Sequence, residues 1–261
     1  MEMESEWEED INIWYDQEHI PEIMAVPGFV SARRFVRVTG PEVRKPAKYL
    51  CIYEMANEHV VLGRSYLTYH TGWKCADRLH TPWTDQSYRH YTTQRSVRRQ
   101  VFPIHRSYTD HSGEPGKAPV PAVGTSLEDN WIQPIGTAII HSLFTPDPQW
   151  EQEILDWHDN VQTPALLACP GFVSARRFML AYDPDRGDPS VVGHYKYVNI
   201  FQMSDETATE TPEYKAAAKD LEASRAAIPA PSHTNEAVYR QVFPIDGPYE
   251  NHTGPGVRAA E

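Results

Sequence analysis

The chain has 261 residues, a net charge of −12 and a pI near 5.4. Such acidity argues against binding to nucleic acid or an anionic membrane, because both require basic patches. No apolar run reaches the roughly 18 residues that cross a bilayer, and the acidic first residues do not resemble a signal peptide. The three cysteines, Cys51, Cys75 and Cys169, form no CxxC pair, so we expect a reduced, cytoplasmic protein without disulfides or structural zinc.

The first half of the chain predicts two helices and three strands. In residues 8–24, apolar side chains recur every three or four positions with charges between them, which is typical of an amphipathic helix. Pro21 predicts a kink or a new first turn inside this helix, and Pro27-Gly28 ends it. The other predicted elements are a strand over 29–38, a loop over 40–46, a strand over 48–55, a helix over 65–79 and a strand over 97–104.

The second half predicts the same order with one additional strand, over residues 136–144, at its start. Residues 105–135 and 246–261 are rich in Gly, Pro and charge, so we expect an extended linker and an extended tail. The remaining predicted elements are a helix over 149–167, strands over 172–182 and 195–203, a helix over 212–227 and a strand over 237–245.

The two halves are copies of one unit. The sequence Pro-Gly-Phe-Val-Ser-Ala-Arg-Arg-Phe occurs at residues 27–35 and again, unchanged, at 170–178. Arg-Gln-Val-Phe-Pro-Ile occurs at 99–104 and at 240–245. The repeated unit exceeds a hundred residues, so it has the size of a domain rather than of a solenoid repeat. The predicted organisation is a first repeat over 1–104, a linker over 105–135, a second repeat over 136–245 and a tail over 246–261.

The first repeat has no counterpart of the strand over 136–144, because counting back equally far from Trp14 passes residue 1. Either the chain is a shortened gene product, or its first sheet lacks an edge strand. An exposed edge promotes aggregation, so we expect the linker or the tail to cover it. An uncovered first sheet would also favour a homodimer.

One motif resembles a known superfamily. Residues 14–21 read Trp-Tyr-Asp-Gln-Glu-His-Ile-Pro, and they are followed by Pro-Gly-Phe at 27–29 and Arg-Arg-Phe at 33–35. A related version begins at residues 157–164. This pattern resembles the dimeric α+β barrel superfamily, particularly its EthD-like members. The resemblance implies an α+β fold of two ferredoxin-like β-α-β-β-α-β repeats, packed sheet to sheet as an intramolecular barrel, with a pocket between each sheet and its helices.

The resemblance leaves the reaction open, because the superfamily includes monooxygenases, cyclases, dehydratases, isomerases, decarboxylases, haem enzymes and stress proteins. Our leading hypothesis is a cofactor-independent lyase, isomerase or cyclase that uses His, Asp and Tyr on a small aromatic or polyketide-like carbonyl compound. The alternatives are a cofactor-free or haem-linked monooxygenase and a non-catalytic binding or stress protein. His70, His80 and His90 are ten residues apart, which fits no metal site. A haem iron needs only one histidine, so haem stays open.

The candidate catalytic residues differ between the repeats. The first repeat has Tyr15, Asp16, Glu18 and His19 on one helical stretch, where a carboxylate beside an imidazole suits acid–base catalysis and a tyrosine can donate to an oxyanion. The second repeat replaces Tyr15, Glu18 and His19 by histidine, valine and glutamine.

The second repeat offers a different set. His141 lies in an apolar strand on the face of Ile139 and Leu143, and the resemblance to cyclase-like members implies that it points into the pocket as a base. If the next helix packs on that face, His141, His158 and Asp159 would converge. The aromatic and histidine side chains expected to contact a substrate are Trp14, Tyr66, Tyr69, His70, Trp73 and Trp157. We expect Arg33 and Arg34 to be structural, paired with carboxylates.

Overall fold

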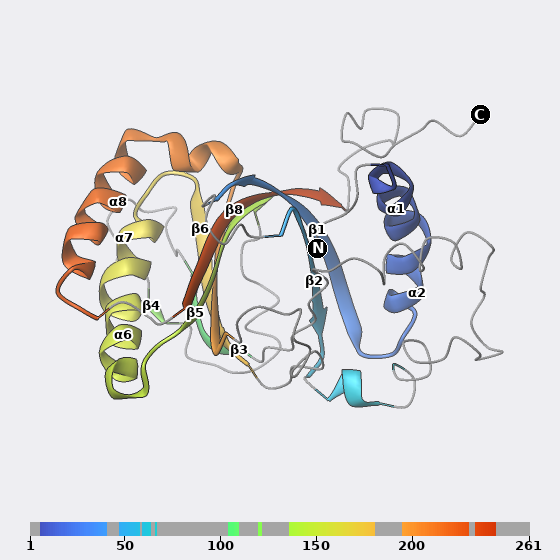
Figure 1. Ribbon diagram of the computed structural model, residues 1–261, viewed down its shortest axis with the longest axis horizontal. Helices are drawn as coiled ribbons and strands as arrows, with labels where there is room; N and C mark the ends of the chain where they lie inside the picture. The colour runs from blue at the N-terminus through green and yellow to red at the C-terminus, as the bar shows by residue number, and fades with distance from the viewer. Residues whose placement is uncertain are drawn as a thin grey trace.

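The computed structural model describes residues 6–40, 47–57, 59–63, 66, 104–109, 120–121, 136–180, 195–229 and 233–243. Its strands form one curled antiparallel sheet in the order β2-β1-β8-β5-β7-β6-β3-β4 (Figure 1). The strands are β1 (Phe29–Thr39), β2 (Tyr49–Met55), β3 (Ile104–Thr109), β4 (Val120–Pro121), β5 (Ala138–Thr145), β6 (Phe172–Met179), β7 (Tyr197–Met203) and β8 (His233–Phe243).

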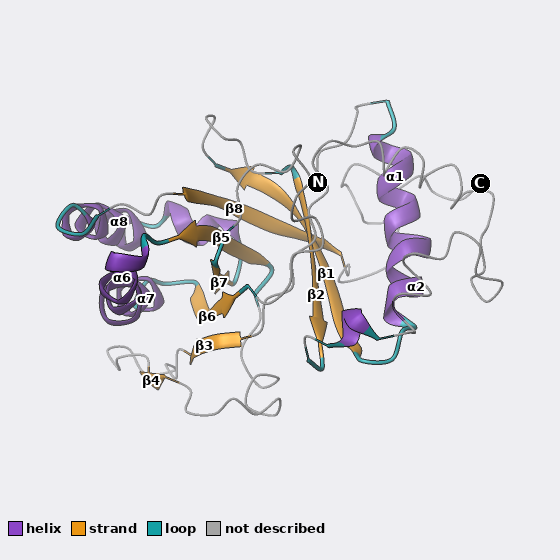
Figure 2. Ribbon diagram, turned by 60° about the horizontal axis from the view of Figure 1, so that its bottom comes forward, coloured by secondary structure: helices purple, strands orange, loops and turns teal. Residues whose placement is uncertain are grey.

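The helices form two separate groups, with α1 and α2 at the right of Figure 1 and α6, α7 and α8 at the left; Figure 2 shows the same two groups. No helix in the described part of the chain is long and apolar enough to cross a membrane. The helical elements are α1 (Glu8–Trp14), η1 (Tyr15–His19), α2 (Ile20–Met24), η2 (Val60–Leu62), η3 (Pro148–Trp150), α6 (Glu151–Trp157), η4 (His158–Gln162), α7 (Thr163–Leu167), η5 (Glu206–Glu210) and α8 (Pro212–Arg225).

The strands of the second half lie in the order β8-β5-β7-β6, which is the antiparallel order of a ferredoxin-like unit. The strand predicted over 136–144 is present as β5, at the centre of this group. Its neighbours pair with it along almost all of its length, β7 from Ala138 to Phe144 and β8 from Ala138 to Thr145. The local hydrophobic pattern therefore predicted the strands of this half correctly.

Strands from the two halves also pair with each other. β8 hydrogen-bonds β5 on one side and β1 on the other, so it joins the second half to the first. β3 begins at Ile104, where the predicted strand ended, and pairs with β6. β4 then pairs with β3, so part of the expected linker is strand rather than extended coil. The helix predicted over 65–79, apart from Tyr66, and the tail lie outside the described residues.

The sheet carries a separate apolar cluster on each of its faces. On β5, Ala138 and Ile140 pack in a cluster with Trp157 and Leu166 of the helices. Ile139, the residue between them, packs in a different cluster with residues of other strands. The helix-facing side and the interior side of the curled sheet are therefore distinct, because successive side chains of a strand point to opposite faces.

The repeated Pro-Gly-Phe turn has a structural cause. Gly28 and Gly171 have φ angles of +100° and +89°, in the left-handed region that favours glycine. A Cβ atom at Gly171 would also lie 2.8 Å from the Cβ atom of Ala208. The turn between helix and strand therefore requires glycine in both halves, whatever the chemistry of the site.

Candidate functional site

The most informative side chains lie on two matching π-helical segments, η1 and η4. Each interrupts an α-helix for five residues and is followed after one residue by proline, Pro21 or Pro164. A proline inside a helix has no N–H to donate and its ring clashes with the carbonyl of the preceding turn, so a wider turn accommodates it. The predicted disturbance at Pro21 is thus present as a π segment, a feature often found at functional sites.

In the first half, η1 brings Tyr15 and His19 together on the helix-facing side of β2. Both side chains are buried, and their ring centroids are 4.6 Å apart. Cys51 of β2 interacts with the Tyr15 hydroxyl, and removal from water raises the pKa of the Cys51 thiol to about 11. Cys51 is therefore a neutral thiol at physiological pH. Tyr15, His19 and Cys51 are called the first cluster below.

In the second half, the equivalent positions hold His158, Gln162 and Asn199, called the second cluster below. The Nδ1 atom of His158 contacts Gln162 Oε1 and lies 3.2 Å from Asn199 Nδ2. Its imidazole also packs against Phe144, with a centroid distance of 4.6 Å. The two halves therefore place three polar side chains at the same point of the fold, with different chemistry in each.

The second cluster holds a neutral imidazole. Burial lowers the pKa of His158 from 6.5 to about 4, and the charges of Arg177 and Arg225 act in the same direction. The hydrogen bond with Gln162 and the charge of Asp159 oppose this shift. Among the described residues, no hydrogen-bond partner contacts Nε2. His158 is therefore uncharged at neutral pH, oriented through Nδ1, and able to accept or donate at Nε2.

The aspartates of both π segments form ion pairs with the sheet. Asp16 pairs with Arg34 of β1, which also donates to Asn12. Asp159 pairs with Arg177 of β6 at 2.6 Å, and both side chains are over nine-tenths buried. Asp16 and Asp159 occupy equivalent positions, as do Arg34 and Arg177. The pairing expected for Arg34 is confirmed, and both aspartates hold their helix against the sheet.

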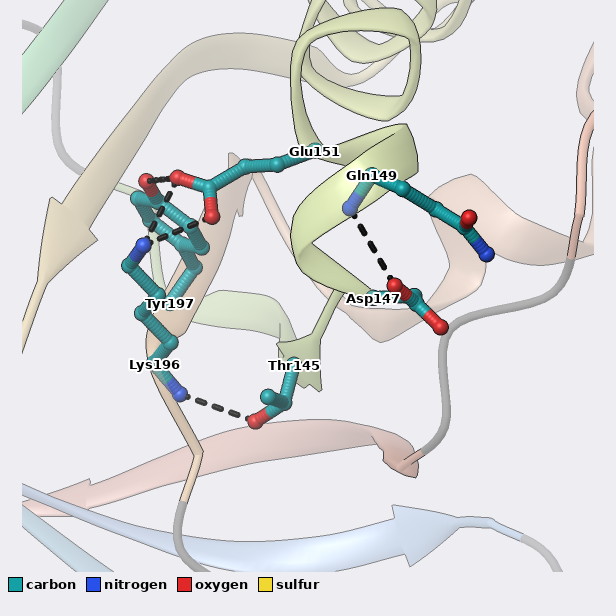
Figure 3. A network of polar contacts seen from close by, with 6 residues as sticks. All are labelled: Thr145, Asp147, Gln149, Glu151, Lys196 and Tyr197. Carbon is teal, nitrogen blue, oxygen red and sulfur yellow. Dashed lines mark hydrogen bonds and ion pairs between the residues drawn. The ribbon is translucent and has the colours of Figure 1, made fainter.

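A second interaction is repeated at the start of each helix. Figure 3 shows Glu151 accepting hydrogen bonds from Lys196 and Tyr197, at 2.6 and 2.7 Å. Glu8 contacts Lys48 and Tyr49 in the same way. Each of these two networks fixes the first turn of the α-helix that precedes a π segment. The networks therefore help to position the two clusters without being part of them.

No family model matches the sequence, and no curated protein sequence matches it. A solved structure of an anthrone oxidase-like protein aligns with a TM-score of 0.54 and 14% identity, over 93% of this chain and 88% of that one. The fold is that of the α+β barrel proteins. Two proteins proposed to be monooxygenases also align. The protein from Lactobacillus acidophilus aligns with a TM-score of 0.42 and 9% identity, over 91% of this chain and 88% of that one. The protein from Fusobacterium nucleatum aligns with a TM-score of 0.43 and 8% identity, over 90% of this chain and 82% of that one.

Within this α+β barrel fold, His141 does not join the second cluster. It lies on the interior face with Ile139 and Leu143, as strand alternation predicts, and its ring is 6.0 Å from that of Tyr239. The helix that carries His158 packs on the other face, against Ala138, Ile140 and Phe144. The expected convergence of His141 with His158 and Asp159 is therefore wrong, because it required the helix to pack on the His141 face.

Three of the side chains expected to contact a substrate are packed against other residues, and the other three lie outside the described residues. Trp14 is fully buried beside Ile11 and Ile20 in an apolar cluster. Trp157 donates its indole N–H to Ser224 of α8 at 3.0 Å, so it joins two helices. Tyr66 stacks on Phe29 with a centroid distance of 5.6 Å. Three expected contacts lie outside the described residues: Tyr69, His70 and Trp73. Across the described ranges, no three His, Cys, Asp or Glu side chains are grouped to hold a metal ion.

Proposed function

We propose that the chain is a cofactor-independent enzyme that removes and returns a proton on a small carbonyl compound, aromatic or polyketide-like. The observation that supports this most directly is the neutral, buried imidazole of His158 in a π segment, oriented through Nδ1 by Gln162 and Asn199. When Nδ1 donates to Gln162, Nε2 carries the lone pair that accepts the substrate proton.

Burial limits what such a base can do, and this limit favours one class of substrate. An isolated imidazolium at this position is unfavourable, because burial lowers the pKa of His158 to about 4. Proton transfer from a carbonyl compound creates an enolate at the same moment as the imidazolium, and the two opposite charges stabilise each other. The carboxylate of Asp159 lies close enough to favour the protonated ring as well.

The first cluster supports the same chemistry with other groups. His19 would exchange the proton, and the Tyr15 hydroxyl would donate to the developing oxyanion, since the two rings lie 4.6 Å apart. We further propose, as for the EthD-like resemblance, that the two repeats build within one chain the barrel that two chains build in that superfamily. The pairing of β1 with β8 and of β3 with β6 supports this arrangement.

Deuterium exchange tests the proposal without knowledge of the natural product. Anthrone, an aromatic ketone with an acidic methylene group, serves as the probe in D₂O under nitrogen, and NMR follows the loss of its methylene protons. We expect the wild-type protein to accelerate exchange. General acid–base catalysis contributes about 10²- to 10⁴-fold, so loss of the responsible histidine should reduce the enzyme-catalysed rate by at least about 100-fold.

The repeats supply the matched variants. His19→Gln introduces the residue found at position 162, and His158→Tyr introduces the residue found at position 15, so each side chain already occurs at that point of the fold. If only one of the two variants loses catalysed exchange, the repeat that carries that histidine is the active one. Equal exchange in the wild type and both variants would overturn the assignment of these histidines.

Oxygenation is the second candidate, because an enolate of this kind also reacts with O₂. The likeness to the anthrone oxidase-like protein concerns the fold, and that protein's name suggests the assay. An oxygen electrode would record one O₂ consumed for each anthrone converted to anthraquinone and water. Exchange under nitrogen together with no enzyme-dependent oxygen uptake in air would favour the lyase, isomerase or cyclase class.

A further inference from the structure

A third polar cluster lies on the interior face of the sheet, away from both helix-facing clusters. It consists of Arg33 on β1, Glu54 on β2, Arg176 on β6 and Gln202 on β7. The guanidinium groups lie over the rings of Phe35 and Phe178, which belong to the interior apolar cluster. Arg33 and Arg176 occupy equivalent positions in the two repeats, and so do Glu54 and Gln202.

Each arginine contacts the other half of the chain. Arg176 donates to Glu54 Oε1 at 2.9 Å, and Ser31 donates to the second oxygen of the same carboxylate at 2.6 Å. Arg33 donates to Gln202 Oε1 at 3.3 Å and to the carbonyl of Gly136 at 3.4 Å. The cluster is therefore built from both repeats, and the two arginine contacts correspond to each other.

The charges of this cluster do not balance. Burial lowers the pKa of Arg33 to about 10, so it remains protonated at neutral pH. Burial acts to raise the pKa of Glu54, but Arg176 and Ser31 hold it below its ordinary value, so it is a carboxylate. Gln202 is neutral. Two guanidinium groups therefore face one carboxylate, which leaves one positive charge in a region where these arginines are over nine-tenths buried.

Within the part of the chain that the structure describes, the same cluster contains buried donors that have no acceptor. They are the Nε atoms of Arg33 and Arg176 and the Nε2 atom of Gln202. Arg33 and Arg176 are 6% and 7% exposed and Gln202 is fully buried. A buried donor without an acceptor costs about 1–3 kcal/mol, and more when it is charged. One acceptor with a single negative charge would both satisfy these donors and balance the charge.

We propose that Arg33, Arg176 and Gln202 bind a small, singly charged anion of the carboxylate class on the interior face of the barrel. The two oxygens of a carboxylate can accept hydrogen bonds from several N–H donors. A divalent anion would leave the cluster with a net negative charge. This site is independent of the proton transfer proposed above, because it lies on the opposite face of the sheet from His158.

The repeats indicate which residue creates the site. The first repeat has glutamate at position 54, and the second has glutamine at the equivalent position 202. Glutamate at both positions would give each arginine its own carboxylate. The substitution Gln202→Glu should therefore fill the role of the anion, whereas Glu54→Gln should leave both arginines without a carboxylate and strengthen anion binding.

The test measures the midpoint of thermal unfolding of the wild type and of the two variants as sodium acetate is added, because the general effect of the salt on folding is shared by all three proteins. An anion that binds only the folded state raises this midpoint. We expect acetate to raise the midpoint of the wild type more than that of Gln202→Glu, and to raise the midpoint of Glu54→Gln most. Removal or addition of one nearby charge should change the apparent acetate dissociation constant by about tenfold, weaker in Gln202→Glu and tighter in Glu54→Gln.

Two results would overturn the proposal: the same acetate dependence in all three proteins, or a larger effect of acetate on Gln202→Glu than on the wild type. If Gln202→Glu does not fold, Glu54→Gln decides alone, and acetate binding that is unchanged or weaker refutes the site. Crystals soaked in sodium bromide give an independent readout, since bromide scatters anomalously. A bromide peak beside the three donors supports an anion site, and a water molecule there without bromide contradicts it.

Discussion

Asp159 and Arg177 form a buried ion pair between the π segment η4 and strand β6, with a distance of 2.6 Å. Removing one partner of such a pair leaves the other charge buried, which costs about 3–5 kcal/mol. We expect Asp159→Asn to lower the free energy of unfolding by about 3 kcal/mol, measured by urea denaturation. Asp16→Asn should cost less, because Arg34 retains its hydrogen bonds to Asn12. A catalytic Asp159 would instead show lost activity with unchanged stability.

The histidines on the two faces predict a pH dependence of stability. Burial lowers the pKa of His141 and of His158 to about 4, while the unfolded chain keeps a value near 6.5. Between pH 6.5 and 4 the unfolded state binds more protons, so stability falls as the pH falls through this range. At about 1.4 kcal/mol per pKa unit, the difference between 6.5 and about 4 gives each histidine at most about 3.5 kcal/mol of this loss.

Urea denaturation at a series of pH values measures this dependence. His158→Tyr should reduce the slope between pH 6.5 and 4 and leave the part due to His141. A slope that is identical in the variant and the wild type would show that His158 is protonated as readily in the folded state as in the unfolded one.

The glycine of the repeated turn predicts a local effect on stability. Gly171→Ala places a side chain at a φ of +89° and at 2.8 Å from Ala208, so it should cost more than about 1 kcal/mol. Gly63→Ala is the control, since Gly63 has an ordinary φ of −69°. The free energies of unfolding of the two variants would be compared. Equal losses in both would argue that the left-handed backbone at Gly171 is unimportant.

The hydroxyl of Tyr197 predicts a smaller effect. It donates to Glu151 at 2.7 Å, and the ring is almost fully buried (Figure 3). Tyr197→Phe should cost about 1 kcal/mol, the usual net contribution of one hydrogen bond. Tyr49→Phe should cost more, because Tyr49 bonds both Glu8 and Asn12. Calorimetry would measure the loss of stability in each variant. A larger loss in Tyr197→Phe than in Tyr49→Phe would contradict the equivalence of the two networks.

The sequence predicted local structure better than it predicted contacts between distant segments. Alternation along β5 correctly placed His141 with Ile139 and Leu143, because side-chain direction in a strand depends only on position. It did not indicate on which face the helix packs, since that is determined by contacts with other strands and with Phe144. The apolar residues Ala138 and Ile140, which lie on the opposite face of β5 from His141, could have indicated that the helix packs on their face.

The repeat comparison predicted the site only in part. It identified Tyr15, His19 and His158 as positions that differ, and the structure places them in two matching clusters. It missed Cys51 and Asn199, which also differ at equivalent positions but lie on strands. It predicted that the arginines pair with carboxylates, yet not that Arg33 contacts a neutral glutamine. That contact depends on the approach of β1 and β7, which no local pattern specifies.

Strand β8 lies between β5 and β1, so residues near the two ends of the described chain are hydrogen-bonded neighbours. Phe35 faces Gln241 across this pair, with 205 residues of chain, 36–240, between them. Closing so long a loop precedes any gain from the pairing, and folds dominated by such distant contacts form slowly. The final joining of the two halves is therefore expected to limit the folding rate, and until it occurs β1 and β8 expose open edges to other chains.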